Sequence, residues 1–158
     1  MILLVERVRA AEVFAAGDLL GRIGTGLLVQ VGFARGDRHI PGIVRLAARR
    51  LLALRLFPDA RGRLSRDVAA ADAEILLVPA FVLAARASGS GRLDLATVEP
   101  AELARPLFED LVKELRTLWP DRVEAGRFGA AMTLRVEHDG PVPYLLRLER
   151  TQADPGCE

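Results

Sequence analysis

The sequence predicts a single α+β domain with an antiparallel sheet and two main helices. Three observations predict it. The length of 158 residues suits one domain, strand-length apolar runs alternate with glycine-containing turns, and only two long segments carry the three- and four-residue apolar spacing of a helix. The 51% hydrophobic content supplies enough apolar side chains for a core, which excludes wholesale disorder.

The first third of the chain is predicted to form three strands. Residues 2–14 are rich in β-branched and aliphatic side chains and end at the turn Ala16-Gly17-Asp18. A short run at 19–24 and a nearly continuous apolar run at 26–33 follow. The short links between these runs favour a meander.

The middle of the chain changes period. Residues 40–54 predict an amphipathic helix that begins near Pro41, and 55–58 a short strand. Residues 75–78 read as a buried strand that is interrupted at Pro79 and continues over 81–84.

The last third contains the strongest helix signal, which runs from Glu99-Pro100 to Leu118 and is stopped by Trp119-Pro120. Residues 132–137 and 144–150 are expected to be two strands joined by a turn at Asp139-Gly140-Pro141. We expect one domain over residues 1–148 and a polar C-terminal tail over 149–158.

Charge and cysteine content restrict the function classes. There are 22 basic and 21 acidic side chains, a net charge of +1, so no global positive field indicates a nucleic acid, although a local patch is allowed. The single cysteine, Cys157, cannot form an intramolecular disulfide or a thiolate cluster, which suits a reducing compartment. No run approaches the ~18 uncharged residues of a membrane span. The sequence predicts a cytoplasmic protein.

Familiar catalytic motifs are absent: the sequence has no P-loop, GxSxG elbow, HExxH or paired CxxC. Gly24-Thr25-Gly26 matches part of a dinucleotide fingerprint but is interpreted as a tight turn inside a hairpin. No metal and no organic cofactor is predicted. Of the two histidines, His39 and His138, the second is better placed as a base, and a solvated turn histidine is the simpler interpretation.

Two further features could contact a ligand. The first is a group of arginines around the first helix, which could meet phosphates but is better interpreted as a solvated face. These are Arg45, Arg49, Arg50, Arg61, Arg63 and Arg66. The second is Gly140-Pro141, because an X-Pro bond can be cis and glycine lets backbone approach a ligand closely; a plain turn is the alternative.

Five segments together carry a resemblance to a known family. They are Leu4-Val5-Glu6-Arg7-Val8, Gly21-Arg22-Ile23-Gly24-Thr25-Gly26-Leu27-Leu28-Val29, Arg55-Leu56-Phe57 with Asp59 and Gly62, Gly126-Arg127-Phe128-Gly129-Ala130 with Met132, and Asp139-Gly140-Pro141-Val142. In kind and in order, over residues 1–148, they resemble the D-aminoacyl-tRNA deacylases, formerly called D-tyrosyl-tRNA deacylases.

The resemblance implies a barrel-like β domain and a homodimer that hydrolyses the ester of D-aminoacyl-tRNA or glycyl-tRNA, a proofreading step in translation quality control. A cis Gly140-Pro141 would reach across the dimer and guard the pocket, with Arg7 holding the motif. The implied partner is the 3′ end of aminoacyl-tRNA, with no DNA and no membrane. The chemistry would rely on backbone N–H groups and the terminal ribose 2′-OH, and Phe81 would present its amide to the developing oxyanion.

The sequence departs from the family at the pocket. The signature Ser-Gln-Phe-Thr-Leu is here Pro79-Ala80-Phe81-Val82-Leu83, so two hydroxyls are missing and Pro79 has no N–H to donate. His138 and Pro143 likewise replace an asparagine and a threonine. Two alternatives therefore stay open: a non-catalytic homodimeric module that still binds tRNA, and a deacylase of altered specificity that admits small L-amino acids.

Overall fold

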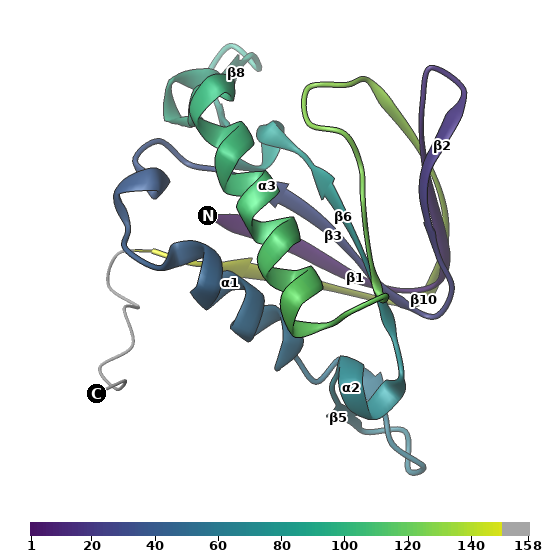
Figure 1. Ribbon diagram of the computed structural model, residues 1–158. Helices are drawn as coiled ribbons and strands as arrows, with labels where there is room; N and C mark the ends of the chain where they lie inside the picture. The colour runs from purple at the N-terminus through teal and green to yellow at the C-terminus, as the bar shows by residue number, and fades with distance from the viewer. Residues whose placement is uncertain (150–158) are drawn as a thin grey trace.

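The computed structural model describes residues 1–149 and shows a curved sheet with helices α1 (Ile43–Leu52) and α3 (Ala101–Leu118) on one face (Figure 1). The strand order is β10-β1-β3-β6-β9, with β2 also paired to β1. The strands of this sheet are β1 (Ile2–Ala15), β2 (Asp18–Ile23), β3 (Gly26–Gly32), β6 (Glu74–Pro79), β9 (Val123–Ala125) and β10 (Met132–Arg147). The predicted α+β class, with a barrel-like sheet and two main helices, is confirmed.

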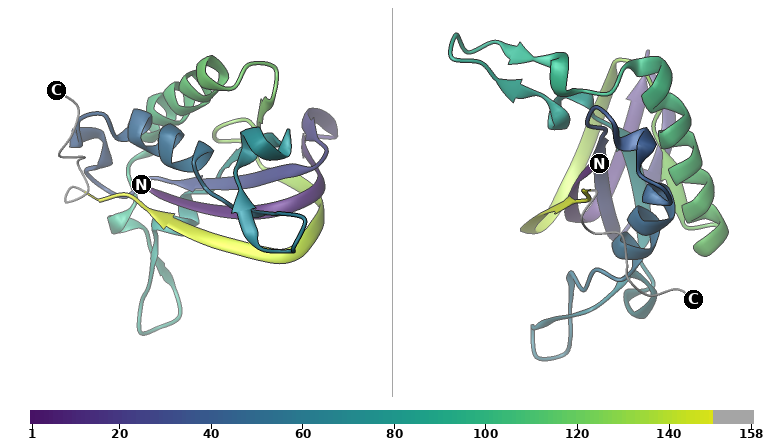
Figure 2. Two further views of the ribbon diagram at one scale, coloured as in Figure 1. Left: turned by 90° about the horizontal axis from the view of Figure 1, so that it is seen from below. Right: turned by 90° about the vertical axis from the view of Figure 1, so that its left-hand side faces the viewer.

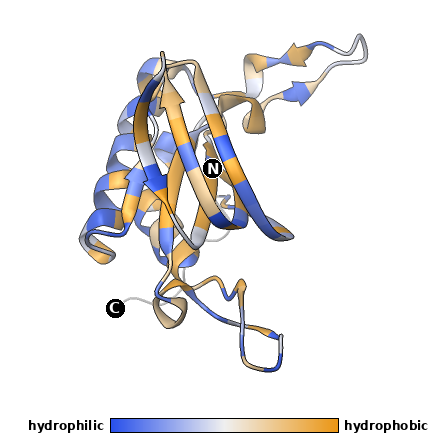
Figure 3. Ribbon diagram, turned by 90° about the vertical axis from the view of Figure 1, so that its right-hand side faces the viewer, coloured by the Kyte–Doolittle hydropathy of each residue, from blue (hydrophilic) through white to orange (hydrophobic). Residues whose placement is uncertain are grey.

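Short elements connect this framework. They are β4 (Phe57–Pro58), β5 (Leu64–Arg66), β7 (Arg86–Ala87), β8 (Leu93–Asp94), the short helix α2 (Val68–Ala71), and the 3₁₀ turns η1 (Asp37–His39), η2 (Phe81–Ala84) and η3 (Leu95–Thr97). The β4–β5 and β7–β8 hairpins project from two ends of the sheet (Figures 2 and 3). Two exposed leucines lie here, Leu93 in β8 and Leu95 directly after it in η3.

The long first strand organises the sheet. All of β1 pairs with β10, but on its other side the first half pairs with β3 and the second half with β2. The strands β2 and β3 therefore follow one another along the same edge of β1, so the expected meander is wrong. Gly24-Thr25-Gly26 connects these two strands and does not lie in a hairpin. Gly26 is required there, since a Cβ on it would stand 2.2 Å from the Glu74 carbonyl oxygen.

Two pairings are parallel, whereas only antiparallel pairing was expected. β3 pairs with β6 and β6 pairs with β9 in parallel register. Parallel neighbours need a crossover, and the two crossovers contain α1 and α3. Because both crossovers cover the same face, the two helices pack side by side over the sheet (Figure 2).

The sheet buries side chains on both faces. One core lies between the sheet and the two helices and includes Leu3 and Val5 of β1. On the other face, β1 contributes Val8, Ala11 and Val13 to a second core. Ala11 and Val13 follow the irregular pairing between Val8 and Ala10. The bulge in β1 thus switches its odd-numbered side chains from the first core, where Leu3 and Val5 lie, to the second, where Ala11 and Val13 lie.

Two local predictions are wrong. Residues 132–147 form one continuous strand, without a turn at Asp139-Gly140-Pro141, because the long β1 offers pairing partners on both sides of the Gly-Pro and a register shift absorbs it. Residues 81–84 form the 3₁₀ turn η2, not a strand, because β6 loses its ladder at Pro79. The predicted tail begins at 149, and its residues 150–158 lie outside the described part of the chain.

Candidate active site

An apolar pocket of about 700 Å³ opens where β3 and β6 end, beneath the first turn of α3. Its walls come from four segments distant in sequence: the end of β3, the start of η2, the start of α3 and the loop before β10. The lining includes Val31, Phe33, Arg35, Pro79, Ala80, Phe81, Val82, Leu95, Val98, Glu99, Ala104, Phe128, Gly129 and Met132. That lining contains no serine, threonine, cysteine, lysine, tyrosine or histidine, so hydrolysis here would depend on backbone groups and on the substrate.

η2 forms the wall that carries Phe81. The Ala80 N–H donates to the Val31 carbonyl at 2.8 Å and the Leu83 N–H to the Ala80 carbonyl at 3.1 Å, which ties η2 to the end of β3. The Phe81 side chain is 59% exposed and its N–H makes no backbone hydrogen bond within residues 1–149. The sequence predicted a strand at Phe81, whereas this residue lies in η2 and lines the pocket.

Gly32 allows η2 to lie this close to β3. A Cβ on Gly32 would stand 2.8 Å from Leu83 Cβ and 3.0 Å from the Ala80 carbonyl oxygen. Leu83 belongs to η2 and Ala80 directly precedes it, so any side chain at position 32 would push the pocket wall outward. Gly32 was not singled out from the sequence, because nothing local distinguishes it from other glycines in apolar runs.

The opposite wall also depends on a glycine. Gly126 lies next to Met132, whose Sδ would be 2.8 Å from an added Cβ, and its N–H donates to the Leu77 carbonyl at 2.8 Å. Phe128 packs against Phe108 at 6.0 Å between ring centroids, under the guanidinium of Arg105 at 5.2 Å. The segment that resembled the family's Gly-x-Phe motif is therefore a pocket wall.

Glu99 is the buried charge at the pocket, with 2% of its surface exposed. Its carboxylate accepts hydrogen bonds from the Gly36 N–H at 2.6 Å and from Arg38 Nη1 at 2.5 Å. The Glu99 N–H also donates to the Phe33 carbonyl at 2.9 Å. These contacts fasten the loop after β3 to the start of α3, and sequence reasoning missed this role because the partners lie about sixty positions apart.

Gly140-Pro141 lies elsewhere on the chain, in the middle of β10, with a cis peptide bond. Neither residue lines the apolar pocket, and Gly140 is exposed. Gly140 has φ +128°, and a Cβ on it would stand 2.7 Å from Val142 Cγ2 and 3.0 Å from the Val142 nitrogen. Only glycine fits this conformation without displacing its neighbours.

Arg7 is buried beneath this motif. Its Nη1 donates to the Leu56 carbonyl at 2.7 Å, and its Nε lies 2.8 Å from Asp139 Oδ2 in an ion pair whose angle falls short of a hydrogen bond. Arg9 adds a longer contact to the same carboxylate, at 3.5 Å. Arg7 therefore joins the strand before Gly140 to the segment before β4.

The histidines lie outside the pocket. His138 is in a strand, not beside a turn, and its Nδ1 is 3.7 Å from Glu6 Oε1, while Asp139 faces Arg7. His39 lies in η1. Neither lines the apolar pocket, which removes both as bases for chemistry within this chain's own pocket.

One shifted pKa within residues 1–149 lies away from the pocket, at Asp59. Hydrogen bonds from the Arg63 N–H, and further ones from Arg61 and Ser65, lower the pKa of Asp59 at the tip of the β4–β5 hairpin. In residues 1–149 no cluster of three or more His, Cys, Asp or Glu side chains is arranged to hold a metal. No helix in this part of the chain is long and apolar enough to cross a membrane.

Comparison with known proteins identifies the family. Residues 4–147 match the family model described as D-Tyr-tRNA(Tyr) deacylase. The chain is 43% identical over 152 residues to the D-aminoacyl-tRNA deacylase of Aromatoleum aromaticum, covering 96% of this chain and 97% of that one. It is 39% identical over 148 residues to the enzyme of the same name from Nitrosococcus oceani, with 94% of each chain covered.

Solved structures share the fold. The c-Myc DNA Unwinding Element Binding Protein superimposes with a TM-score of 0.85 at 30% identity, covering 94% of this chain and 99% of that chain. A probable eukaryotic D-amino acid tRNA deacylase superimposes with a TM-score of 0.79 at 16% identity, covering 92% of this chain and 97% of that chain. This similarity shows a shared fold. With its motifs in order and its pocket at the end of β3 and β6, the chain belongs to the D-aminoacyl-tRNA deacylase family.

Proposed function

We propose that this protein hydrolyses the ester bond of D-aminoacyl-tRNA, or of glycyl-tRNA, and so removes mischarged amino acids before translation uses them. The family match over residues 4–147 carries the proposal. In the reaction, water adds to the ester carbonyl and the bond to the ribose oxygen breaks. The water hydroxyl stays on the amino acid and its proton passes to the ribose oxygen, which releases free amino acid and tRNA.

The Phe81 amide is the proposed oxyanion donor. It lies at the pocket wall, and no backbone acceptor within residues 1–149 uses it. A single donor of this kind stabilises the transition state by about 3–4 kcal/mol. Since the lining offers no hydroxyl, thiol, amine or imidazole side chain, the terminal ribose 2′-OH is the proposed partner of the attacking water, as the family resemblance implies.

Gly140-Pro141 is the proposed chirality filter, and it acts in the pocket of a partner subunit. Both residues lie outside the pocket of their own chain, so they reach an aminoacyl group only in a second copy. The exposed Tyr144 and Leu145 on the same strand provide apolar area for such a contact. A rigid backbone there would collide with an L side chain and tolerate a D side chain or none.

The alternatives predict a different pocket. A binding module without activity would be favoured by a pocket filled by Pro79 or His138. Pro79 instead forms part of an open wall beside Phe81, and His138 does not line the pocket. This arrangement favours the deacylase, and we place its action in the cytoplasm, where aminoacyl-tRNA is used.

Hydrolysis of D-Tyr-tRNA, Gly-tRNA and L-Ala-tRNA by the purified protein tests the proposal, with the double variant Gly140→Ala, Pro141→Ala alongside. We expect cleavage of the D-tyrosyl and glycyl esters by the parent and altered selectivity in the variant. Cleavage of L-Ala-tRNA alone would support the altered-specificity alternative. No cleavage of any ester, by protein whose circular dichroism shows it folded, would reject the deacylase and leave the binding module.

The oligomeric state is a separate test. We expect light scattering at micromolar concentration to give twice the chain mass of 17.2 kDa. A monomer under those conditions would contradict the cross-subunit role of Gly140-Pro141.

A further inference from the structure

A second pocket, of about 620 Å³, lies at the other half of η2. The apolar pocket is bounded by Ala80, Phe81 and Val82, whereas the second is bounded by the residues that follow them, from Leu83 to Arg86. Arg35 lines both. The two pockets therefore adjoin at η2 and Arg35.

Three arginines from separate segments line the second pocket: Arg35 after β3, Arg86 in β7 and Arg147 at the end of β10. Arg35 Nε donates to the Ala96 carbonyl at 2.6 Å, which fixes its guanidinium, and its terminal nitrogens make no hydrogen bond within residues 1–149. Over the same residues, Arg86 and Arg147 take part in no ion pair. Three arginines from distant parts of the chain thus line one cavity.

Two carboxylates also line this pocket, Asp37 and Glu149. Asp37 is buried, accepts a hydrogen bond from the Ala34 N–H at 2.7 Å and lies 2.6 Å from the Met1 amino group, so its charge is compensated. Glu149 is exposed. The cavity keeps an excess of positive charge, which favours an anion.

We propose that this second pocket binds a phosphodiester of the tRNA 3′ strand, next to the terminal nucleotide whose ester lies in the apolar pocket. The inference rests on the proposed function. If the last nucleotide of the strand occupies the apolar pocket, the phosphates before it must leave that pocket across one of its walls. The wall at Arg35 is shared with the second pocket, which is basic. Guanidinium groups match phosphate oxygens in pairs, which suits them to this role.

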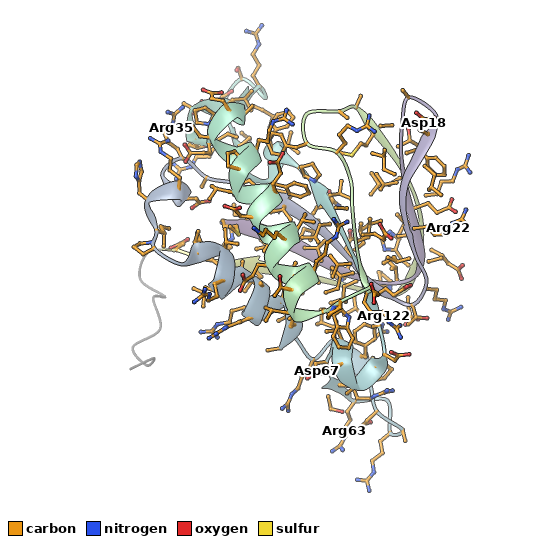
Figure 4. All side chains as sticks on the ribbon, viewed as in Figure 1. Asp18, Arg22, Arg35, Arg63, Asp67 and Arg122 are labelled. Carbon is orange, nitrogen blue, oxygen red and sulfur yellow. The ribbon has the colours of Figure 1, made fainter. Side chains whose placement is uncertain are left out.

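The arginines near the first helix are a different group. Figure 4 places Arg35 at the end of the molecule where α3 begins and Arg63 at the opposite end, on the β4–β5 hairpin. Arg49 and Arg50 are exposed on α1 and line neither pocket, so they provide a matched control for the second pocket.

Binding of a fluorescent oligoribonucleotide with the tRNA 3′ sequence ACCA, followed by anisotropy over a range of salt, tests the assignment. The double variant Arg86→Gln, Arg147→Gln should bind about fivefold or more weakly, and its salt slope should fall by about 0.7 for each phosphate that it no longer neutralises. The control Arg49→Gln, Arg50→Gln, with the same change of charge, should bind as the parent does. Equal weakening in both, or in neither, would overturn the assignment.

Kinetics separate this inference from the proposed function. For D-Tyr-tRNA the pocket variant should raise KM and leave kcat, whereas for D-tyrosyl-adenosine, which lacks the phosphates, KM should stay that of the parent. An equal rise for both substrates would overturn the phosphate assignment while the deacylase stands. Failure of the parent to hydrolyse either substrate, with the oligonucleotide result retained, would reject the deacylase and keep the phosphate site. Competition by inorganic phosphate at constant ionic strength, without oligonucleotide binding, would mean a free-anion site and overturn the proposal.

Discussion

Gly32 and Leu83 stand so close that β3 and η2 can meet only without a side chain at position 32: an added Cβ would be 2.8 Å from Leu83 Cβ. This close approach sets where η2 lies, and η2 carries the Phe81 amide to the pocket. The position of the proposed oxyanion donor in η2 thus depends on a glycine at the end of β3.

We expect Gly32→Ala to displace η2 and to lower kcat for D-Tyr-tRNA more than it raises KM. Overpacking of this kind costs about 1–3 kcal/mol of folding stability. Gly89→Ala is the control, because nothing lies within 4 Å of a Cβ there. Kinetics and thermal unfolding measure both effects, and parent-like kcat in a folded Gly32→Ala protein would contradict the positioning role.

Gly140→Ala should change stereoselectivity. The added Cβ would meet Val142 Cγ2 at 2.7 Å, and φ of +128° is a conformation that alanine adopts only at a cost of about 1–3 kcal/mol. We expect the ratio of D-Tyr-tRNA to L-Tyr-tRNA hydrolysis to fall or all hydrolysis to stop. An unchanged ratio would show that this backbone does not discriminate between enantiomers.

Asp139→Asn should destabilise the strand that bears Gly140, because it leaves the buried Arg7 guanidinium without its counter-charge. A loss of about 1–3 kcal/mol is expected on urea unfolding. In a double-mutant cycle with Arg7→Met, the two changes should cost less together than the sum of the single changes. Additive costs would mean that the ion pair contributes nothing of its own.

Glu99→Gln should loosen the loop after β3. The substitution removes the charge that holds Arg38 and weakens the hydrogen bond from the Gly36 N–H, at an expected cost of about 1–3 kcal/mol. Glu102→Gln, on the exposed face of α3, is the matched control. Amide exchange at Gly36 should quicken in the first variant alone, and equal exchange in both would argue against the clamp.

The elements with a strong period were predictable from the sequence. In α3, Ala104, Phe108, Leu111 and Leu115 recur at helical spacing and are all buried, and the helix itself agrees with expectation. The strand β3 was predicted from a continuous apolar run, and the structure gives the reason for that run: both faces of β3 are covered. Predictions from weak periodicity were wrong at residues 81–84 and around Gly140-Pro141, because partners distant in sequence decide the local conformation there.

The order of residues was enough to predict the fold class, the family motifs and Arg7, Phe81, Gly140 and Pro141 as candidate site residues. Packing decided how these residues are distributed: Phe81 lines the pocket, while Gly140 and Arg7 lie together on another part of the chain. It also placed Gly32 against η2, Glu99 between the loop after β3 and the start of α3, and three arginines around the second pocket. The physical reason is that periodicity reports which face of a segment is buried, whereas a site is made by contacts between segments tens of residues apart, which only the packed sheet brings within bonding distance.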